Sequence, residues 1–237
     1  MTTDRHVLAL ETSTEACSIA LQSGGQVFHR HALAPRQHAE LALPWVEAVC
    51  AEAGISRKQI THLAVGAGPG AFTGVRLGVA LVQGLAFAHA LPVAAFSTLR
   101  IVATTAQAQE GQRIAVAMDA RMQEVYWGEF EWRSGVPVAL SEARVCPPED
   151  VHVMTPGWLG FGTGFSAYAE RFTQLDQAKL SIVDPNALPD GRALLQLANV
   201  ADREYAWHAA EAIEPIYLRN NVAQTIAERE AAKRDAS

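Results

Sequence analysis

One glycine-rich stretch, residues 66–78, has the composition and spacing of a segment that could bind a phosphate. It joins an apolar run to a long apolar segment, and glycine-rich turns before helices often present backbone N–H groups to anions. Two known patterns nevertheless fail. A phosphate-binding P-loop requires Lys where this chain has Val75, and a dinucleotide fingerprint requires Gly or Ala where it has Thr73. The spacing favours a tight structural turn over a nucleotide site. The residues of that turn are Gly68, Pro69, Gly70 and Gly74.

Other candidate groups for chemistry are few. His29 and His31 alternate along an expected strand, so both imidazoles would lie on one face. No third ligand is suggested nearby in the sequence, and we expect an edge pair rather than a metal site. Asp119 and Arg121 follow another expected strand and could orient a phosphate, although an ion pair within the turn is the simpler expectation.

Common catalytic motifs are missing from the chain. There is no H-E-x-x-H, and Gly164–Tyr168 departs from G-x-S-x-G because it ends in Tyr. The sequence therefore predicts no catalytic residue, no cofactor-binding residue and no metal ligand.

Composition narrows the class of protein. The chain has 237 residues, is 49% hydrophobic and carries a net charge of −6, which disfavours a stand-alone nucleic-acid binder. Its three cysteines form no C-x-x-C pair, and Met1–His6 is a short polar start, so we expect a cytoplasmic protein. The apolar run 74–91 is interrupted by Arg76, Gln83 and His89, which favours a buried helix over a membrane span.

Strands and helices alternate in the first half of the chain. Residues 7–11, 17–22 and 26–31 predict three adjacent strands, and a fourth is expected at 62–66. Periodic apolar residues predict helices over 37–53 and 73–90. The second helix is apolar nearly all round and must be covered on both sides, while its small residues Ala80, Gly84 and Ala88 would let another helix approach closely. A deeply buried helix and an interface with a partner protein both fit this pattern.

A second sheet is expected to begin at residue 113, again with three strands. The sequence thus predicts an α/β protein with an N-terminal lobe at 1–105, a C-terminal lobe at 106–225, closed by a helix near 188–205, and a charged tail at 226–237.

The run 68–78 closely resembles the signature of the TsaB (YeaZ) family of bacterial tRNA threonylcarbamoyladenosine biosynthesis proteins. Residues 8–14, 38–44, 118–121 and 214–219 agree in the same order, and the match spans about residues 6–220. Most members have Asp where this chain has Glu11. The resemblance implies a two-lobed fold like that of actin and the Hsp70 ATPase, which agrees with the two three-strand openings.

The same resemblance implies a partner. The related catalytic subunit TsaD transfers a threonylcarbamoyl group to the adenosine beside the anticodon, and it holds its metal partly through H-x-E-x-H. The equivalent segment here, residues 98–102, has neither His and replaces the acid by Arg100. The resemblance therefore implies a non-catalytic scaffold that pairs with TsaD through the two first-lobe helices, with the ATPase TsaE docking on the pair. It further implies a homodimer when the chain is alone, and contact with tRNA only through the complex.

Apolar residues of the two helices are expected to form that interface. They are Trp45, Val46, Val49, Val75, Leu77, Leu81 and Val82. An alternative from another class stays open: a nucleotide-dependent phosphotransferase or a glycoprotease-type peptidase of the same fold. Against a peptidase stand the missing nucleophile and metal ligands. Against a phosphotransferase stands the lack of a phosphate-binding pair of the Asp-Gly-Gly type, since Glu11 and Asp119 are the only carboxylates at plausible strand ends.

Overall fold

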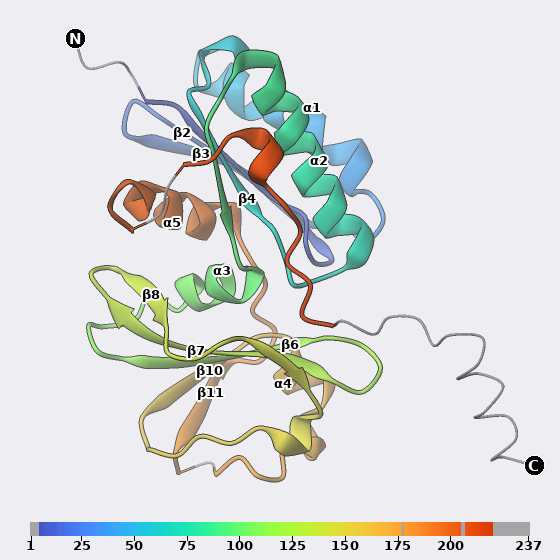
Figure 1. Ribbon diagram of the computed structural model, residues 1–237, viewed down its shortest axis with the longest axis vertical. Helices are drawn as coiled ribbons and strands as arrows, with labels where there is room; N and C mark the ends of the chain where they lie inside the picture. Colours follow the sequence, from blue (N-terminus) through green and yellow to red (C-terminus); the bar gives the residue numbers. More distant parts are fainter. Residues whose placement is uncertain (1–4, 177, 205–206, 220–237) are drawn as a thin grey trace, which may run out of the picture.

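Two mixed β-sheets, one above the other, form two lobes with helices between and beside them (Figure 1). The computed structural model describes residues 5–176, 178–204 and 207–219. The predicted α/β class and the two-lobed architecture are confirmed.

The first sheet has the strand order β3-β2-β1-β4-β5. Its strands are β1 (Val7–Glu11), β2 (Ala16–Ser23), β3 (Gln26–Leu33), β4 (His62–Gly66) and β5 (Val93–Phe96). The β1–β2 and β2–β3 pairs are antiparallel, whereas β4 and β5 run parallel to β1. The predicted bounds of β1 and β4 match the structure, and β2 and β3 are slightly longer than predicted.

Both faces of this sheet are covered, which explains why β1 is apolar without alternation. Helices α1 (His38–Glu52) and α2 (Phe72–His89) cover one face, where Leu8 and Leu10 are buried. Helix α5 (Gly191–Glu204) covers the opposite face, where Val7 and Ala9 are buried.

The second sheet repeats the strand arrangement of the first, with the order β11-β10-β6-β7-β8 and β9 paired to β7. Three antiparallel strands again open the lobe, and β10 and β11 then run parallel to β6. The strands are β6 (Arg113–Asp119), β7 (Val125–Arg133), β8 (Val136–Ala139), β9 (Arg144–Cys146), β10 (Trp158–Phe161) and β11 (Leu180–Asp184). A short helix, α4 (Gly164–Ala167), follows β10.

Helix α3 (Thr98–Thr105) lies between the two sheets. Its Leu99, Val102 and Ala103 pack on the second sheet, while Ile101 joins the core beneath α5. The helix therefore links the cores of the two lobes.

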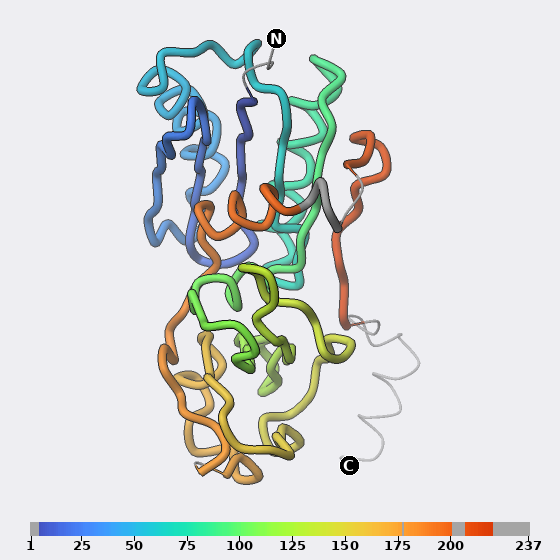
Figure 2. The backbone as a smooth tube through the Cα atoms, turned by 90° about the vertical axis from the view of Figure 1, so that its left-hand side faces the viewer, coloured from blue at the N-terminus to red at the C-terminus, as the bar shows by residue number. Residues whose placement is uncertain are grey.

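The C-terminal part of the described chain packs on the first lobe, so the expected boundary between the lobes is wrong. We expected residues 106–225 to form the second lobe, but α5 packs on the first sheet, as Figures 1 and 2 both show. The Gly191 N–H donates to Ser18 Oγ at 2.8 Å, and Leu194 and Leu197 are fully buried against the first lobe. Further on, the Ile216 N–H donates to the carbonyl oxygen of Ala67 at 2.7 Å. The expected tail, 226–237, lies outside the described residues.

Replacing Leu194 tests this assignment of α5 to the core of the first lobe. Leu194 is 0% exposed, so Leu194→Ala should lower the free energy of unfolding by about 2–5 kcal/mol, because it leaves a cavity. Val183→Ala on β11 is the control, since Val183 is 54% exposed and its truncation should cost less than about 0.5 kcal/mol. Urea denaturation measures both. Equal losses in the two variants would contradict the packing of α5.

Candidate functional site

The glycine turn before α2 is packed against the chain's own backbone. A Cβ at Gly70 would lie 2.2 Å from the Ser13 carbonyl oxygen, and one at Gly74 would lie 2.1 Å from that of Thr12. The Ala71 N–H donates to the Ser13 oxygen at 2.7 Å, and Thr12 Oγ1 donates to the Gly74 oxygen at 2.8 Å. Only glycine permits this approach. The connection between β1 and β2 therefore lies where a phosphate would have to contact Gly70 and Gly74.

The first half of the turn, Gly68 and Pro69, also lies close to backbone atoms of other segments. Gly68 has a φ of +102°, and a Cβ there would lie 2.8 Å from the Ile216 carbonyl oxygen. A cis peptide bond joins Gly68 to Pro69. The Thr98 N–H donates to the Gly68 oxygen at 2.8 Å. Gly68, Pro69, Gly70 and Gly74 thus lie where the β1–β2 connection, the start of α3 and the 216 region meet.

Glu11 lies buried at the end of β1. Its Oε1 accepts hydrogen bonds from the Ser13 N–H, at 2.6 Å, and from the Ser13 hydroxyl. Its Oε2 has no hydrogen-bond partner in the described part of the chain. Burial raises the pKa of Glu11 from its ordinary value of 4.5 to about 7, against the opposing effect of the Ser13 hydrogen bonds.

A polar cleft of about 280 Å³ lies between the lobes. Ser13 and Gly70 line it from the first lobe, and Thr163 and Ser166 line it from the second. Asp119 also lines the cleft, but its carboxylate already accepts hydrogen bonds from the Arg121 side chain, at 2.8 Å, and from the Tyr168 hydroxyl, at 2.8 Å. The predicted ion pair of Asp119 with Arg121 is confirmed.

Helix α3 begins with residues 98–102, which the resemblance led us to expect as the counterpart of a metal-binding segment. Thr98 is buried, and its hydroxyl donates to Ser13 Oγ at 2.9 Å. Arg100 is only 6% exposed, and its Nε donates to the Pro137 carbonyl oxygen at 2.7 Å. Val102 is fully buried. This segment therefore presents a buried guanidinium, a buried hydroxyl and a buried apolar side chain, and none of the three is an imidazole or a carboxylate.

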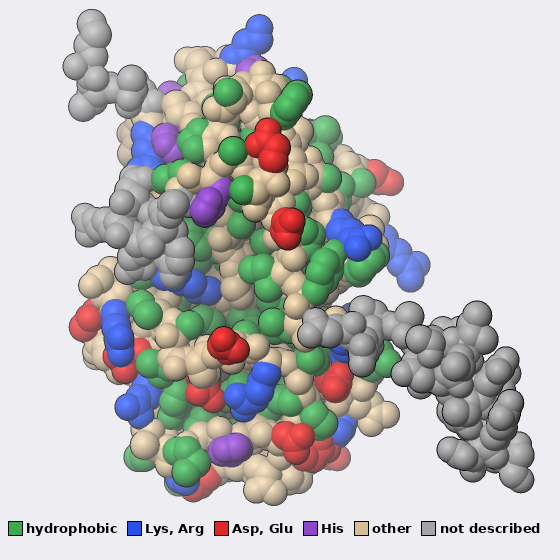
Figure 3. Space-filling model, in the orientation of Figure 1, with side chains coloured by type: hydrophobic (Ala, Val, Ile, Leu, Met, Phe, Trp, Pro, Cys, Tyr) green, Lys and Arg blue, Asp and Glu red, His purple; other side chains and the backbone are tan. Residues whose placement is uncertain are grey.

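Helix α2 presents an apolar side to solvent, so of the two expectations for this helix the deeply buried one is wrong. Phe87 is 80% exposed, and a Cβ on Gly84 would have no neighbour within 4 Å. The exposed Arg76 lies at the edge of this side, near the N-terminal end of the helix. We call seven other exposed and half-buried residues of this side the α2 outer face, and none of these seven is charged. They are Thr73, Leu77, Ala80, Leu81, Gly84, Phe87 and Ala88. Figure 3 shows hydrophobic side chains, interspersed with acidic and basic ones, over this part of the molecule.

The predicted interface residues divide into two groups. Trp45, Leu77 and Leu81 are half-buried and reach the surface of α1 and α2. The other four contribute to the core beneath that surface, with exposed fractions of 2% or less. They are Val46, Val49, Val75 and Val82. Leu43 on α1, 40% exposed, and Phe87 were absent from the predicted set although they present more apolar area to solvent.

An apolar groove of about 490 Å³ adjoins the N-terminal end of α2. The Arg76 guanidinium lies 3.7 Å from the Phe72 ring centroid, and its Nε donates to the Tyr217 hydroxyl at 2.7 Å. Phe72 is 55% exposed and Met122, across the groove, is 76% exposed. The apolar surface of α2 therefore continues toward the second lobe.

Helix α2 is also, among the described residues, the one helix long and apolar enough to cross a membrane. Core helices of soluble proteins pass the same test, so this property by itself is weak evidence for a membrane location.

The histidine pair on β3 has an acidic neighbour that sequence spacing did not reveal. Asp190, just before α5, lies 3.5 Å from His29 and 3.8 Å from His31. These three residues are far apart in sequence, and only the return of the chain to the first lobe brings them together.

Glu11→Gln tests the raised pKa. Because the folded protein binds the Glu11 proton more tightly than the unfolded chain does, this contribution to stability is complete below about pH 4.5 and is lost as the pH rises through about 7. Gln stays neutral, so between pH 5 and 8 the unfolding free energy of the parent protein should fall relative to the variant, by up to about 3 kcal/mol. Urea titrations across this range measure it.

Glu15, an exposed carboxyl near Glu11 in the sequence, offers a matched control for the urea titrations between pH 5 and 8. Glu15→Gln should follow the parent curve, because this side chain lies at the surface. Parallel curves for the parent protein and Glu11→Gln would contradict the burial of an ionisable carboxyl at this position.

Comparison with known proteins identifies relatives that belong to tRNA threonylcarbamoyladenosine biosynthesis. Residues 27–227 match the family described as TsaD, tRNA N6-adenosine threonylcarbamoyltransferase. The tRNA threonylcarbamoyladenosine biosynthesis protein TsaB of Haemophilus influenzae is 39% identical, over 91% of this chain and 94% of that protein. TsaB of Escherichia coli is 38% identical, over 92% of this chain and 96% of that protein.

A solved structure gives the same result. YeaZ from Pseudomonas aeruginosa superimposes with a TM-score of 0.79 at 40% sequence identity, covering 89% of this chain and all of the other. This chain takes part in the biosynthesis of threonylcarbamoyladenosine in tRNA. It belongs to the TsaD-type family of tRNA threonylcarbamoyladenosine proteins and, within that family, to the TsaB (YeaZ) members.

Proposed function

We propose that this chain is a non-catalytic subunit that activates TsaD by pairing with it through the outer faces of α1 and α2. TsaD transfers the threonylcarbamoyl group to the adenosine beside the anticodon, and TsaE docks on the pair. The tRNA contacts this chain only through the complex, and the complex works in the cytoplasm.

The observation that carries this proposal is the uncharged outer face of α2. An isolated surface helix normally directs a polar side to solvent, whereas here Leu77, Leu81 and Phe87 follow one another along the accessible side. The small residues Ala80, Gly84 and Ala88 lie among them and are exposed. Within the described residues, a Cβ at Gly84 would meet no atom within 4 Å, so contacts among these residues do not explain the glycine, and a partner helix could come close at this point.

The core beneath supports such a surface. Val46 and Val49 of α1 and Val82 of α2 are fully buried together against the first sheet. They hold the two helices side by side, so the partner meets a rigid pair rather than two independent helices. Trp45, Leu77 and Leu81 lie at the boundary between this core and solvent, where burial of a large apolar side chain contributes about 1.5–3 kcal/mol.

The side chains between the lobes argue against a catalytic role. Arg100 and Val102 occupy positions that would have to supply metal ligands, and Arg100 is bonded to the β8 backbone. The carboxylate of Asp119 is paired, and Glu11 is enclosed at the end of β1. The charge of Asp119 is thus already compensated by Arg121, and Glu11 does not line the cleft. The alternative enzyme, a phosphotransferase or peptidase, would need other residues.

A homodimer is the proposed state of the chain without its partner. The same outer faces would pair with those of a second copy, because an apolar surface of this extent is unfavourable in water. Homodimer and complex with TsaD would then compete for one surface.

Gly84→Arg tests the proposed surface with little risk to the fold, since a side chain at Gly84 points into open space. A large charged group there should weaken the affinity for TsaD by about tenfold or more, because it prevents close helix approach. Gly84→Ala should bind nearly as well as the parent protein. Titration calorimetry or sedimentation with purified TsaD measures the affinities.

Ile182→Arg on β11 is the matched control, because Ile182 is 48% exposed in the second lobe, away from α2.

Val79→Asp would be a poor choice, since Val79 is 4% exposed and its replacement would disturb the core. Unchanged affinity in both Gly84→Arg and Phe87→Asp would contradict the proposed face. The same two variants should also shift the chain from dimer to monomer.

A further inference from the structure

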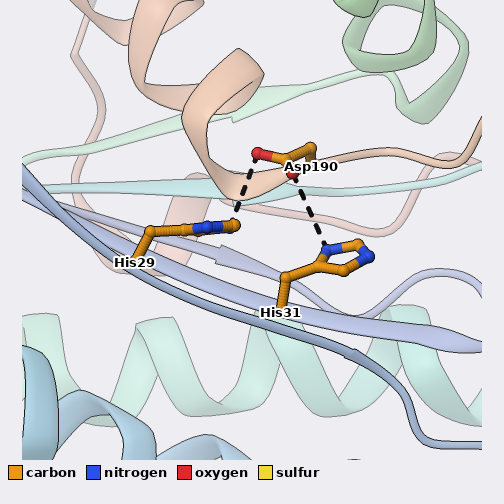
Figure 4. A group of neighbouring side chains, drawn as sticks. All are labelled: His29, His31 and Asp190. Atoms are coloured by element: carbon orange, nitrogen blue, oxygen red, sulfur yellow. Dashed lines mark ion pairs between the residues drawn. The ribbon is translucent and has the colours of Figure 1, made fainter.

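Three potential metal ligands converge where β3 passes the start of α5. His29 and His31 alternate along β3 and project from the same face of the sheet, and Asp190 immediately precedes the first residue of α5 (Figure 4). Figure 4 shows both imidazole rings directed toward the Asp190 carboxylate. We propose that these three side chains form a binding site for a transition-metal dication such as Zn²⁺.

The distances suit such a site. His29 Nε2 lies 3.5 Å from Asp190 Oδ1, and His31 Nδ1 lies 3.8 Å from Asp190 Oδ2. One ligand atom of each residue lies within 4.8 Å of the others. With metal–ligand bonds of about 2.0–2.2 Å in a tetrahedral site, ligand atoms are separated by about 3.3 Å. Small side-chain rotations would therefore bring all three atoms into coordination.

The surroundings of the site favour a neutral imidazole with an accessible lone pair. The side chains of His29 and Asp190 are 18% and 14% exposed, whereas that of His31 is 33% exposed. Burial lowers the pKa of His29, against the opposing effect of the Asp190 carboxylate, and it is the neutral imidazole that coordinates a metal. The more open side next to His31 admits water as a fourth ligand.

Ser18 holds the His29 ring in place. Ser18 Oγ lies 3.0 Å from His29 Nε2 and accepts a hydrogen bond from the Gly191 N–H at 2.8 Å. The Ser18 oxygen and His29 Nε2 are thus within hydrogen-bonding distance of each other. Coordination of a metal at Nε2 would replace this one hydrogen bond, which is a small cost.

Arg192 both orients and opposes the site. Its backbone N–H and Nε donate to Asp190 Oδ1 at 2.7 and 3.1 Å, and its Nη2 donates to Oδ2 at 3.1 Å. These bonds fix the carboxylate toward β3, as partners of metal ligands commonly do. The guanidinium charge repels a dication, however. Two imidazoles and one carboxylate therefore select Zn²⁺, Co²⁺ or Ni²⁺ over Mg²⁺ or Ca²⁺, which depend on oxygen ligands and negative charge.

A bound metal would join the edge strand of the first sheet to α5. Both elements belong to the same lobe, so a metal that binds only the folded chain would raise its stability. This role is independent of the surface on α1 and α2.

Titration of the full chain with Co²⁺ and with Zn²⁺ tests the proposal. Visible absorption should report one equivalent of Co²⁺ in a nitrogen and oxygen environment, without the charge-transfer band of a thiolate ligand, and Zn²⁺ should raise Tm. His31→Gln should weaken binding by about tenfold or more, because it removes a direct ligand. Asp190→Asn should do the same.

Two further variants separate coordination from incidental effects. His152→Gln, which removes an exposed histidine elsewhere, should bind as the parent protein does. Arg192→Gln should bind severalfold more tightly, because it removes the opposing charge. Absence of binding by the parent protein, or equal affinity in the parent and His31→Gln, would overturn the site. Circular dichroism shows that each variant is folded.

Discussion

The close contact between the β1–β2 connection and the first turn of α2 determines much of this structure. The carbonyl oxygens of Thr12 and Ser13 occupy the space that Cβ atoms at Gly74 and Gly70 would need. A third glycine, Gly78, continues the contact one turn later, where a Cβ would lie 2.7 Å from Thr12 Oγ1. The start, direction and rotation of α2 over the sheet are therefore fixed by backbone contacts rather than by exchangeable side chains.

The rotation of α2 has a functional consequence. Val79 and Val82 turn toward the sheet, so the opposite side of the helix, with Gly84 and Phe87, is presented to solvent. The same contact fills the glycine turn with protein, which is a different use of glycine from phosphate binding. The glycine turn fixes the direction of α2, and the α2 outer face is uncharged. Both features suit a subunit that acts by binding another protein.

The sequence predicted local structure better than long-range packing. The apolar run 7–11 and the pattern 62–66 predicted β1 and β4 correctly, because buried parallel strands carry an unbroken apolar signal. Strand β11 was not predicted, since only Leu180 of its residues is buried and the edge strand lacks alternation. The position of α5 was predicted wrongly because its amphipathic pattern shows which side is buried but not against which sheet.

The candidate sites show the same limit. The apolar character of α2 was evident from its residues, but whether Val82 or Phe87 reaches solvent depends on the rotation that the glycine contact imposes. The neighbourhood of His29 and Asp190 depends on the path of the chain after β11, for which no local signal exists. The absence of ligand residues at 98–102 could be read directly, because it depends on residue type alone.

The central claim is that this chain acts through association with TsaD rather than through chemistry of its own. Reconstituted threonylcarbamoylation of tRNA tests it most directly, with TsaD and TsaE alone, with this chain alone, and with all three. The account predicts modified tRNA only when the chain and TsaD are present together. Equal activity of TsaD and TsaE without the chain, or modification by the chain alone, would contradict it.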